Sequence, residues 1–295
     1  EAVTYVRTTR RPAFLHLSVI RLLGHAGSDL ELSYRTEAEV ESVEAKDPLL
    51  VTARQIVARG LMRPAQILAR YETIRTTIRE SALLANHEPK LASAAEVVAP
   101  LSPRSPDRVA ALATAPLDHA QRHLRETFWG GRLPELDRPR HLAVLLNRAL
   151  GDLLVQFPEA MIFGEDVGSK GGVYHVTAEL MRRARAGRVF DTQLDETTIL
   201  GLAIGLAQMG ALPIPEIQYL AYLHNAEDQL RGEAASLSFF SNGQFQNPLV
   251  VRIASFGYQK GFGGHFHNDN ALGVLRDIPG LVIAAPSNGF DAVQM

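Results

Sequence analysis

Acidic side chains gather directly before an apolar helix that the sequence predicts from Thr198 to Gln208. The preceding segment, Asp191–Glu196, follows a predicted strand and carries three carboxyl groups. A carboxyl group beside apolar surface loses solvation, which raises its pKa toward the range that proton transfer at neutral pH requires. Glu196 is therefore a candidate general acid or base. The alternative is a local role, in which Asp195 or Glu196 caps the positive end of the helix.

Two histidines occupy alternate positions in the loop His265–Asp269. In an extended chain both rings point to one side, which suits an acid/base pair that includes His267, or two ligands of a zinc ion. A zinc site needs a third ligand, and no residue at a fixed spacing supplies one. The glycines of residues 257–264 could form a backbone cradle, although their spacing matches neither the P-loop nor the dinucleotide fingerprint.

Three more candidates follow predicted strands. Glu165 comes directly after a short apolar strand, Tyr222 lies in the segment after another strand, and His25 lies in a polar loop after a strand predicted at residues 14–23. Two of them have a plain structural alternative. Tyr222 would then be an ordinary interface aromatic, and His25 a solvated loop residue.

Strands and helices alternate through the second half of the chain. The pattern predicts strands at residues 160–163, 188–191, 212–217, 249–253 and 281–284, separated by helices at 142–157, 176–186, 198–208 and 225–237. Such alternation indicates an α/β fold with a doubly wound, mainly parallel sheet. Ligands bind outside the carboxyl ends of the strands in these sheets, so we expect Glu165, Glu196, Tyr222 and His267 at one edge.

The first part of the chain is organised differently. Helices are predicted to begin at Pro48 and Pro64, because proline suits the first helical position. Five prolines between residues 86 and 116 interrupt regular structure. We therefore predict a domain at residues 1–88, a linker at 89–138 and a second domain at 139–295. The chain has no initiating methionine and stops in the first turn of a predicted helix, so we expect it to be a segment of a longer polypeptide.

Composition is that of an ordinary globular protein. The 295 residues carry a formal net charge of −2 and are 46% hydrophobic, which gives no reason to expect a nucleic-acid partner or disorder. Zero cysteines exclude disulfides, thiol nucleophiles and thiolate metal sites. The longest apolar run, Ile199–Ala207, is too short to span a bilayer, and the first residues show no secretory signal. We expect a cytoplasmic protein with no membrane partner.

Several blocks of the second half occur together and in the order that is typical of one family. They are FGEDVGSKGGVYHVT, RVFDTQLDE, GLAIGLAQMGALPIPEIQY, EDQLRGEAA, NPLVVRI and HFHNDNALGVLRDIPGLVIAAPS. The blocks resemble the beta subunit of the thiamin-diphosphate-dependent decarboxylating component of 2-oxoacid dehydrogenase complexes, a transketolase-like family. Upstream, IRLLGHAGSDLELSYRT resembles the carboxyl-terminal part of its alpha subunit. The resemblance implies an alpha-beta fusion, with part of a diphosphate-binding domain before a pyrimidine-binding domain.

The same resemblance implies residue roles. Glu196 matches the glutamate that hydrogen-bonds the aminopyrimidine ring of the coenzyme, and Tyr222 matches the aromatic residue that stacks on that ring. His267 and His25 match the beta and alpha histidines that lie near the reacting carbons. Glu165 matches an acid in the GEDVG block and is expected close to the cofactor.

The implied reaction is oxidative decarboxylation of a 2-oxoacid with acyl transfer to a lipoyl domain, in a homo-oligomer whose active site forms between subunits or domains. The EIQY block resembles those of branched-chain and bacterial pyruvate enzymes alike; we favour branched-chain acids. The implied cofactors are thiamin diphosphate and magnesium, whose Gly-Asp-Gly binding motif is expected upstream of Glu1, so the isolated chain should show negligible turnover. Asn268 and Asp269 stand where the family has Ser-Gln. The alternative function is a non-catalytic assembly segment or pseudo-enzyme.

Overall fold

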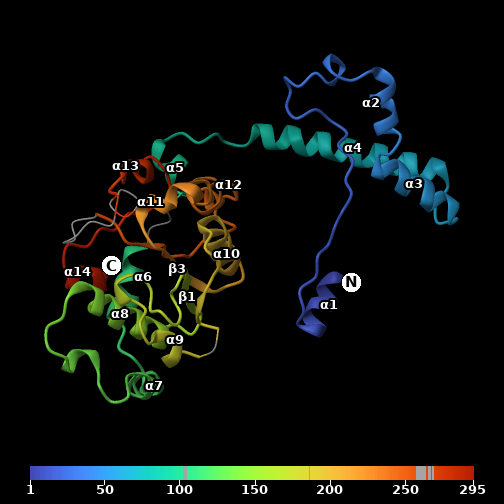
Figure 1. Cartoon of the computed structure of the whole chain (residues 1–295). Coiled ribbons are helices and arrows are strands. Elements are labelled where there is room, and N and C mark those ends of the chain that lie inside the picture. The colour runs from blue at the N-terminus through green and yellow to red at the C-terminus, as the bar shows by residue number, and fades with distance from the viewer. Residues whose placement is uncertain (102–104, 186, 257–263, 265–266, 268) are drawn as a thin grey trace. The chain divides into compact units, whose positions relative to one another are not determined.

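The computed structural model describes residues 1–101, 105–185, 187–256, 264, 267 and 269–295. It contains two compact units, residues 1–90 and residues 91–295 (Figure 1). Each unit has its own architecture. The predicted division into residues 1–88, 89–138 and 139–295 stays a prediction.

The first unit is helical. Its elements are α1 (Ala2–Thr9), the 3-10 helix η1 (Glu31–Ser33), α2 (Glu37–Glu44), α3 (Pro48–Ala58) and α4 (Pro64–His87). Proline begins α3 and α4 as predicted, and Asp47 caps α3 by accepting a hydrogen bond of 2.7 Å from the amide of Leu49. The predicted strand at residues 14–23 is wrong. No strand exists among residues 1–101, all of which the structure describes, so this segment has no strand to pair with.

The second unit is built around a four-stranded sheet. Its strands are β1 (Ala160–Gly164), β2 (Val189–Asp191), β3 (Leu212–Ile217) and β4 (Arg252–Ile253), in the order β2-β1-β3-β4 and all parallel. This confirms the predicted α/β fold class. Because β2 and β3 flank β1 on opposite sides, the strand order reverses between the carboxyl ends of β1 and β3. An open parallel sheet forms its ligand crevice at that point.

Helices make up most of the rest of this unit. They are α5 (Ala94–Val98), α6 (Pro106–Thr114), α7 (His119–Trp129), η2 (Pro134–Leu136), α8 (Leu142–Gln156), η3 (Val173–His175), α9 (Leu180–Arg183), α10 (Glu196–Gln208), α11 (Leu220–Leu223), η4 (His224–Ala226), the π-helix η5 (Gln229–Ala234), α12 (Leu237–Phe240), α13 (Gly273–Arg276) and α14 (Gly289–Gln294). The helix predicted at residues 176–186 is shorter, because Glu179 has a φ of 66° that interrupts it. Residues 281–284, predicted as a strand, have no regular structure.

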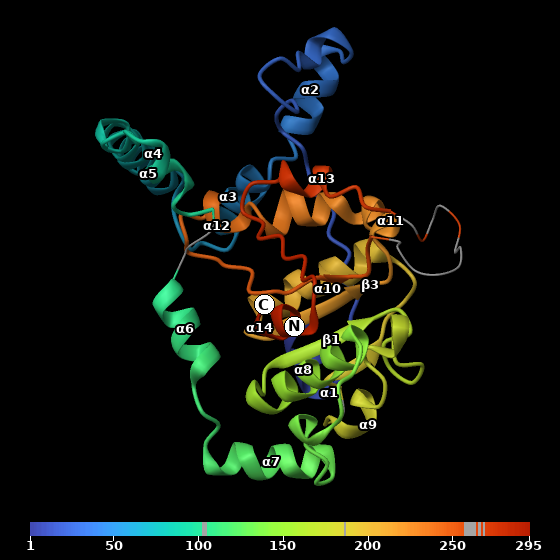
Figure 2. The same cartoon turned by 90° about the vertical axis from the view of Figure 1, so that its left-hand side faces the viewer.

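Apolar cores cover both faces of the sheet. Side chains alternate along β1, so Ile162 packs in the cluster that contains Leu154 of α8, whereas Phe163 packs in the cluster that contains Leu200 of α10. Both views show α8 and α10 on opposite sides of the strands (Figures 1 and 2). The sheet is therefore doubly wound, as predicted.

The predicted linker supplies part of this core. Trp129, the last residue of α7, is 3% exposed, and its Nε1 donates a hydrogen bond of 2.8 Å to Asp152 of α8. Arg125 donates to both carboxylate oxygens of Asp152, at 2.8 and 2.9 Å. Gly151 is required here, because a Cβ would lie 2.4 Å from the Trp129 ring. In the part of the chain that the structure describes, no helix is long and apolar enough to cross a membrane.

Candidate functional site

The loop after β1 carries Glu165 and is held by its neighbours on both sides. The amide of Gly168 donates to Asp191 of β2 at 2.6 Å, and the amide of Val173 donates to Glu216 of β3 at 3.1 Å. Gly164 is needed for close approach, because a Cβ there would lie 2.5 Å from the carbonyl oxygen of Glu216. Glu165 thus projects from a fixed loop at the reversal of the strand order.

A buried ion pair supports that loop from within the sheet. Glu216 is 1% exposed and pairs with the guanidinium of Arg252, its register partner on β4. Burial lowers the pKa of Arg252 to about 10, which still leaves the guanidinium charged at neutral pH. The carboxylate of Glu216 therefore joins β3, β4 and the loop at Val173.

Glu196 is the first residue of α10 and is half-buried. The capping role belongs to its neighbour, because Asp195 accepts the hydrogen bond of 3.2 Å from the amide of Thr198. Burial raises the pKa of Glu165, and the negative charges of Asp166 and Glu196 raise it further. The charge of Glu196 therefore contributes to the electrostatic environment of Glu165, the residue that follows β1.

Aromatic side chains surround His267. The Tyr222 hydroxyl and His267 Nε2 are 3.1 Å apart, and the Tyr219 ring meets the imidazole edge-on with centroids 4.6 Å apart. The Tyr174 ring lies edge-on to Tyr219, with its backbone at a φ of 55° that is uncommon for a side chain of this size. Burial raises the pKa of Tyr219, so this phenol stays neutral at neutral pH. The imidazole of His267 is thus held by two tyrosines from one segment.

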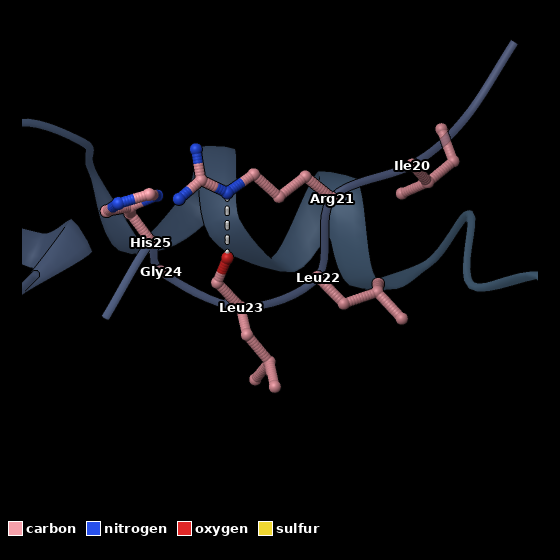
Figure 3. A pocket seen from close by; sticks show the side chains of 6 residues that line it. All are labelled: Ile20, Arg21, Leu22, Leu23, Gly24 and His25. Carbon is pink, nitrogen blue, oxygen red and sulfur yellow. Dashed lines mark hydrogen bonds between the residues drawn. The ribbon is translucent and has the colours of Figure 1, made fainter. Parts of the chain in front are cut away.

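His25 lies in the first unit, in an open hollow lined by residues 20–25 (Figure 3). Its ring and the Arg21 guanidinium point to one side of the turn, whereas the side chains of Leu22 and Leu23 point to the other (Figure 3). The amide of His25 donates to Asp29 at 2.6 Å, and Arg21 lies 3.5 Å from the same carboxylate. Asp29 therefore orders the exposed loop that carries His25.

This loop should open on acidification. The hydrogen bond from His25 holds the pKa of Asp29 below its usual value, with smaller contributions from Tyr34, Arg21 and Arg35. Because the folded-state pKa is lowered, the stabilisation is present above the unfolded-state pKa and is lost as pH falls through the folded-state one. We expect hydrogen exchange of the His25 amide, corrected for its intrinsic rate, to lose protection only below the usual aspartate range.

The variant Asp29→Asn should lower that protection already at neutral pH, because an amide oxygen is a weaker acceptor than a carboxylate. The matched control is Asp47→Asn, which changes the cap of α3 and should leave the His25 amide unaffected. Unchanged protection in Asp29→Asn would show that the carboxylate does not order the loop.

Among the predicted residues, the structure brings Tyr222 and His267 into contact, whereas Glu196 acts on Glu165 through its charge. His265, Asn268 and all of the predicted glycine cradle except Gly264 lie outside the described residues. Within the described ranges, no group of three or more His, Asp and Glu side chains could hold a metal ion.

Sequence reasoning missed other members of this region. Glu216 had a signal, because a charged residue inside an apolar strand needs a buried partner. Tyr174 and His224 have no such signal in the sequence, because the residues that they contact are distant in the chain. His224 contacts Asp269 across 45 residues.

Comparison with known proteins identifies the family of the chain. Residues 140–295, more than half of the chain, match the family described as the transketolase pyrimidine-binding domain, and residues 1–94 match the dehydrogenase E1 component family. The chain therefore belongs to the transketolase pyrimidine-binding domain family. The two matches confirm the predicted resemblance to the thiamin-diphosphate-dependent E1 component of 2-oxoacid dehydrogenases.

Curated relatives carry names from both substrate classes. The pyruvate dehydrogenase E1 component subunit beta of Staphylococcus epidermidis is 39% identical over 152 residues, which cover 50% of this chain and 45% of the relative. The subunit of the same name from Staphylococcus aureus has the same identity and coverage. The 2-oxoisovalerate dehydrogenase subunit beta of Pseudomonas aeruginosa is 36% identical over 147 residues, 50% of this chain and 41% of the relative. The chain thus spans less than half the length of these relatives.

Proposed function

We propose that the full-length protein containing this chain catalyses the oxidative decarboxylation of a 2-oxoacid with thiamin diphosphate. The observation that carries the proposal is the half-buried Glu196 at the start of α10, directly after the loop that follows β2, while Asp195 rather than Glu196 caps the helix. The family of the chain supports it independently. We also propose that residues 1–88 and 139–295 act as separate domains.

The residues present fit the pyrimidine end of the cofactor. A carboxyl group can hydrogen-bond a ring nitrogen, and an aromatic side chain can pack against a planar ring. Glu196 and Tyr222 would hold the ring, with Glu165 nearby. When bound, thiamin diphosphate supplies the carbon nucleophile and the electron sink for loss of carbon dioxide. We propose that magnesium and the diphosphate are held by residues outside this chain.

The side chains of this chain would then have separate roles in binding and transferring protons. Glu196 holds or moves a proton at a pyrimidine nitrogen, while the raised pKa of Glu165 lets that neighbour keep its own proton to higher pH. Tyr222 holds His267 through the 3.1 Å contact at Nε2, which fixes the direction of the imidazole toward developing charge. We propose a further proton-handling role for His25, whose loop is ordered by Asp29.

The partners follow from the same proposal. The acceptor of the acyl group would be a lipoyl domain, the protein would act as a homo-oligomer in the cytoplasm, and the substrate would be a branched-chain 2-oxoacid or pyruvate. The names of the relatives include both substrate classes.

The test is reduction of an artificial electron acceptor by the full-length protein with thiamin diphosphate and magnesium, using pyruvate and 2-oxoisovalerate in parallel. We expect turnover with at least one of them, with a preference of at least about 10-fold, because their side chains differ by two carbons and a single methylene in a fitted pocket is already worth about 10- to 200-fold. No reduction with any 2-oxoacid would contradict the proposal and favour a non-catalytic assembly segment.

A further inference from the structure

Asp269 joins several segments next to His267. Its Oδ2 lies 2.9 Å from His224 Nε2, and its Oδ1 accepts a hydrogen bond of 2.9 Å from the amide of Ala271. Its carbonyl oxygen accepts from the amide of Phe256 and from the hydroxyl of Ser255, both at 3.2 Å. Asp269 therefore ties the chain that follows His267 to the chain that follows β4.

His224 offers Asp269 a rigid partner. It begins η4, directly after α11, and the nearby residues Leu223 and Ala226 are both 0% exposed in the core. The backbone carbonyl of Asn225 also accepts a hydrogen bond of 3.3 Å from Thr197, the residue after Glu196. The His224 side chain is 40% exposed, so it projects from a fixed backbone toward the surface.

Two polar side-chain contacts connect the same two segments, in addition to the edge-on packing of Tyr219 against His267. Tyr222 meets His267, and two residues further along each segment His224 meets Asp269. With only one polar contact, the segment that carries His267 could still rotate around that contact. Two contacts fix both the position and the direction of the imidazole, which is the precision that a group acting on a substrate requires.

The charges around His224 favour the pair. Asp269 is the nearer carboxylate, and Glu227 Oε2 lies 4.0 Å from the other ring nitrogen. The hydrogen bond from His224 lowers the pKa of Asp269, so the carboxylate is ionised at neutral pH. An N–H donor facing an ionised acceptor makes a hydrogen bond stronger than a neutral pair.

We propose that His224 and Asp269 are positioning residues that clasp the segment carrying His267 and hold its imidazole against Tyr222. The functional part of this inference rests on the proposed function, in which His267 acts on the substrate. The contact between His224 and Asp269, which we call the clasp, can be tested separately by hydrogen exchange.

The experiment compares Asp269→Ala, His224→Phe and the double variant in the full-length protein, assayed with thiamin diphosphate, magnesium and the better 2-oxoacid. Each single variant should lower kcat about 10- to 100-fold, because a displacement of about 1 Å costs that much, with KM changed less than about threefold. The double variant should be no worse than Asp269→Ala alone, because that single variant already removes the contact that His224→Phe removes. Unchanged kcat in both single variants, or fully additive losses, would overturn the proposal.

Two further variants separate positioning from misfolding. His224→Gln keeps an N–H donor and should recover most of the activity that His224→Phe loses, whereas equal losses in the two would argue against the clasp. Asp228→Ala removes a surface ion pair with Arg231 on the same stretch and should leave kcat unchanged.

Hydrogen exchange gives a reading that does not depend on catalysis. In Asp269→Ala and His224→Phe, the amides of Phe256 and Ala271 should exchange faster, whereas Asp228→Ala should match the parent protein. If the parent protein turns over no 2-oxoacid, the proposed function fails while faster exchange still supports the clasp. Unchanged exchange in both variants overturns the clasp whatever the activity.

Discussion

The variant Glu196→Gln should lose nearly all 2-oxoacid-dependent turnover in the full-length protein. We expect kcat to fall about 10²- to 10⁴-fold, which is the usual contribution of a positioned acid or base. An amide has nearly the shape of the carboxyl group but cannot take up or give a proton at neutral pH. The measurement is the rate of electron-acceptor reduction at saturating substrate and cofactor.

The neighbouring Asp195 supplies a sharp control. Asp195→Ala removes the cap of α10 and should lower the free energy of unfolding by about 1 kcal/mol while kcat changes only a few-fold. If Glu196→Gln kept parental turnover and only lowered stability, Glu196 would be a structural residue of the helix start. The assignment of chemistry to this carboxyl group would then fail.

The sequence predicts elements well where local pattern and pairing agree. Residues 212–217 form β3 over the predicted range, because an apolar run bounded by turn residues lies next to β1, which has the same character. Residues 14–23 show an equally strong pattern and form no strand, because a strand needs a hydrogen-bonded neighbour that residues 1–101 do not contain. Local pattern states what a segment can become, and the available partner decides the outcome.

The site shows the same division between local and distant information. Glu165 follows β1 and Glu196 begins the helix after β2, so the edge rule of parallel sheets predicts a shared position at the carboxyl edge from local order alone. The contact between His224 and Asp269 joins residues 45 apart, through short helical elements that have no apolar periodicity to announce them. The core position of Trp129 could not be predicted for a related reason. Nearby prolines indicate a linker, whereas the Trp129 side chain packs on α8, a helix further along the chain.

The variant Glu216→Gln should strongly destabilise the second unit. It leaves the Arg252 guanidinium buried without a negative partner, and breaking a buried ion pair in this way costs about 3–5 kcal/mol. Trp129 is the single tryptophan of the chain and lies in the core of the same unit, so its fluorescence during urea denaturation reports the loss.

Two control variants distinguish the effect of an unpaired buried charge from the effect of general disruption of the core. Glu233→Gln makes the same chemical change at an exposed position and should alter the free energy of unfolding by less than about 0.5 kcal/mol. The double change Glu216→Met with Arg252→Met removes both charges and should cost less than Glu216→Gln alone, since apolar replacements of buried ion pairs are often neutral. A double variant less stable than the single one would mean that the pair itself, through Val173 and the loop of Glu165, holds the unit together.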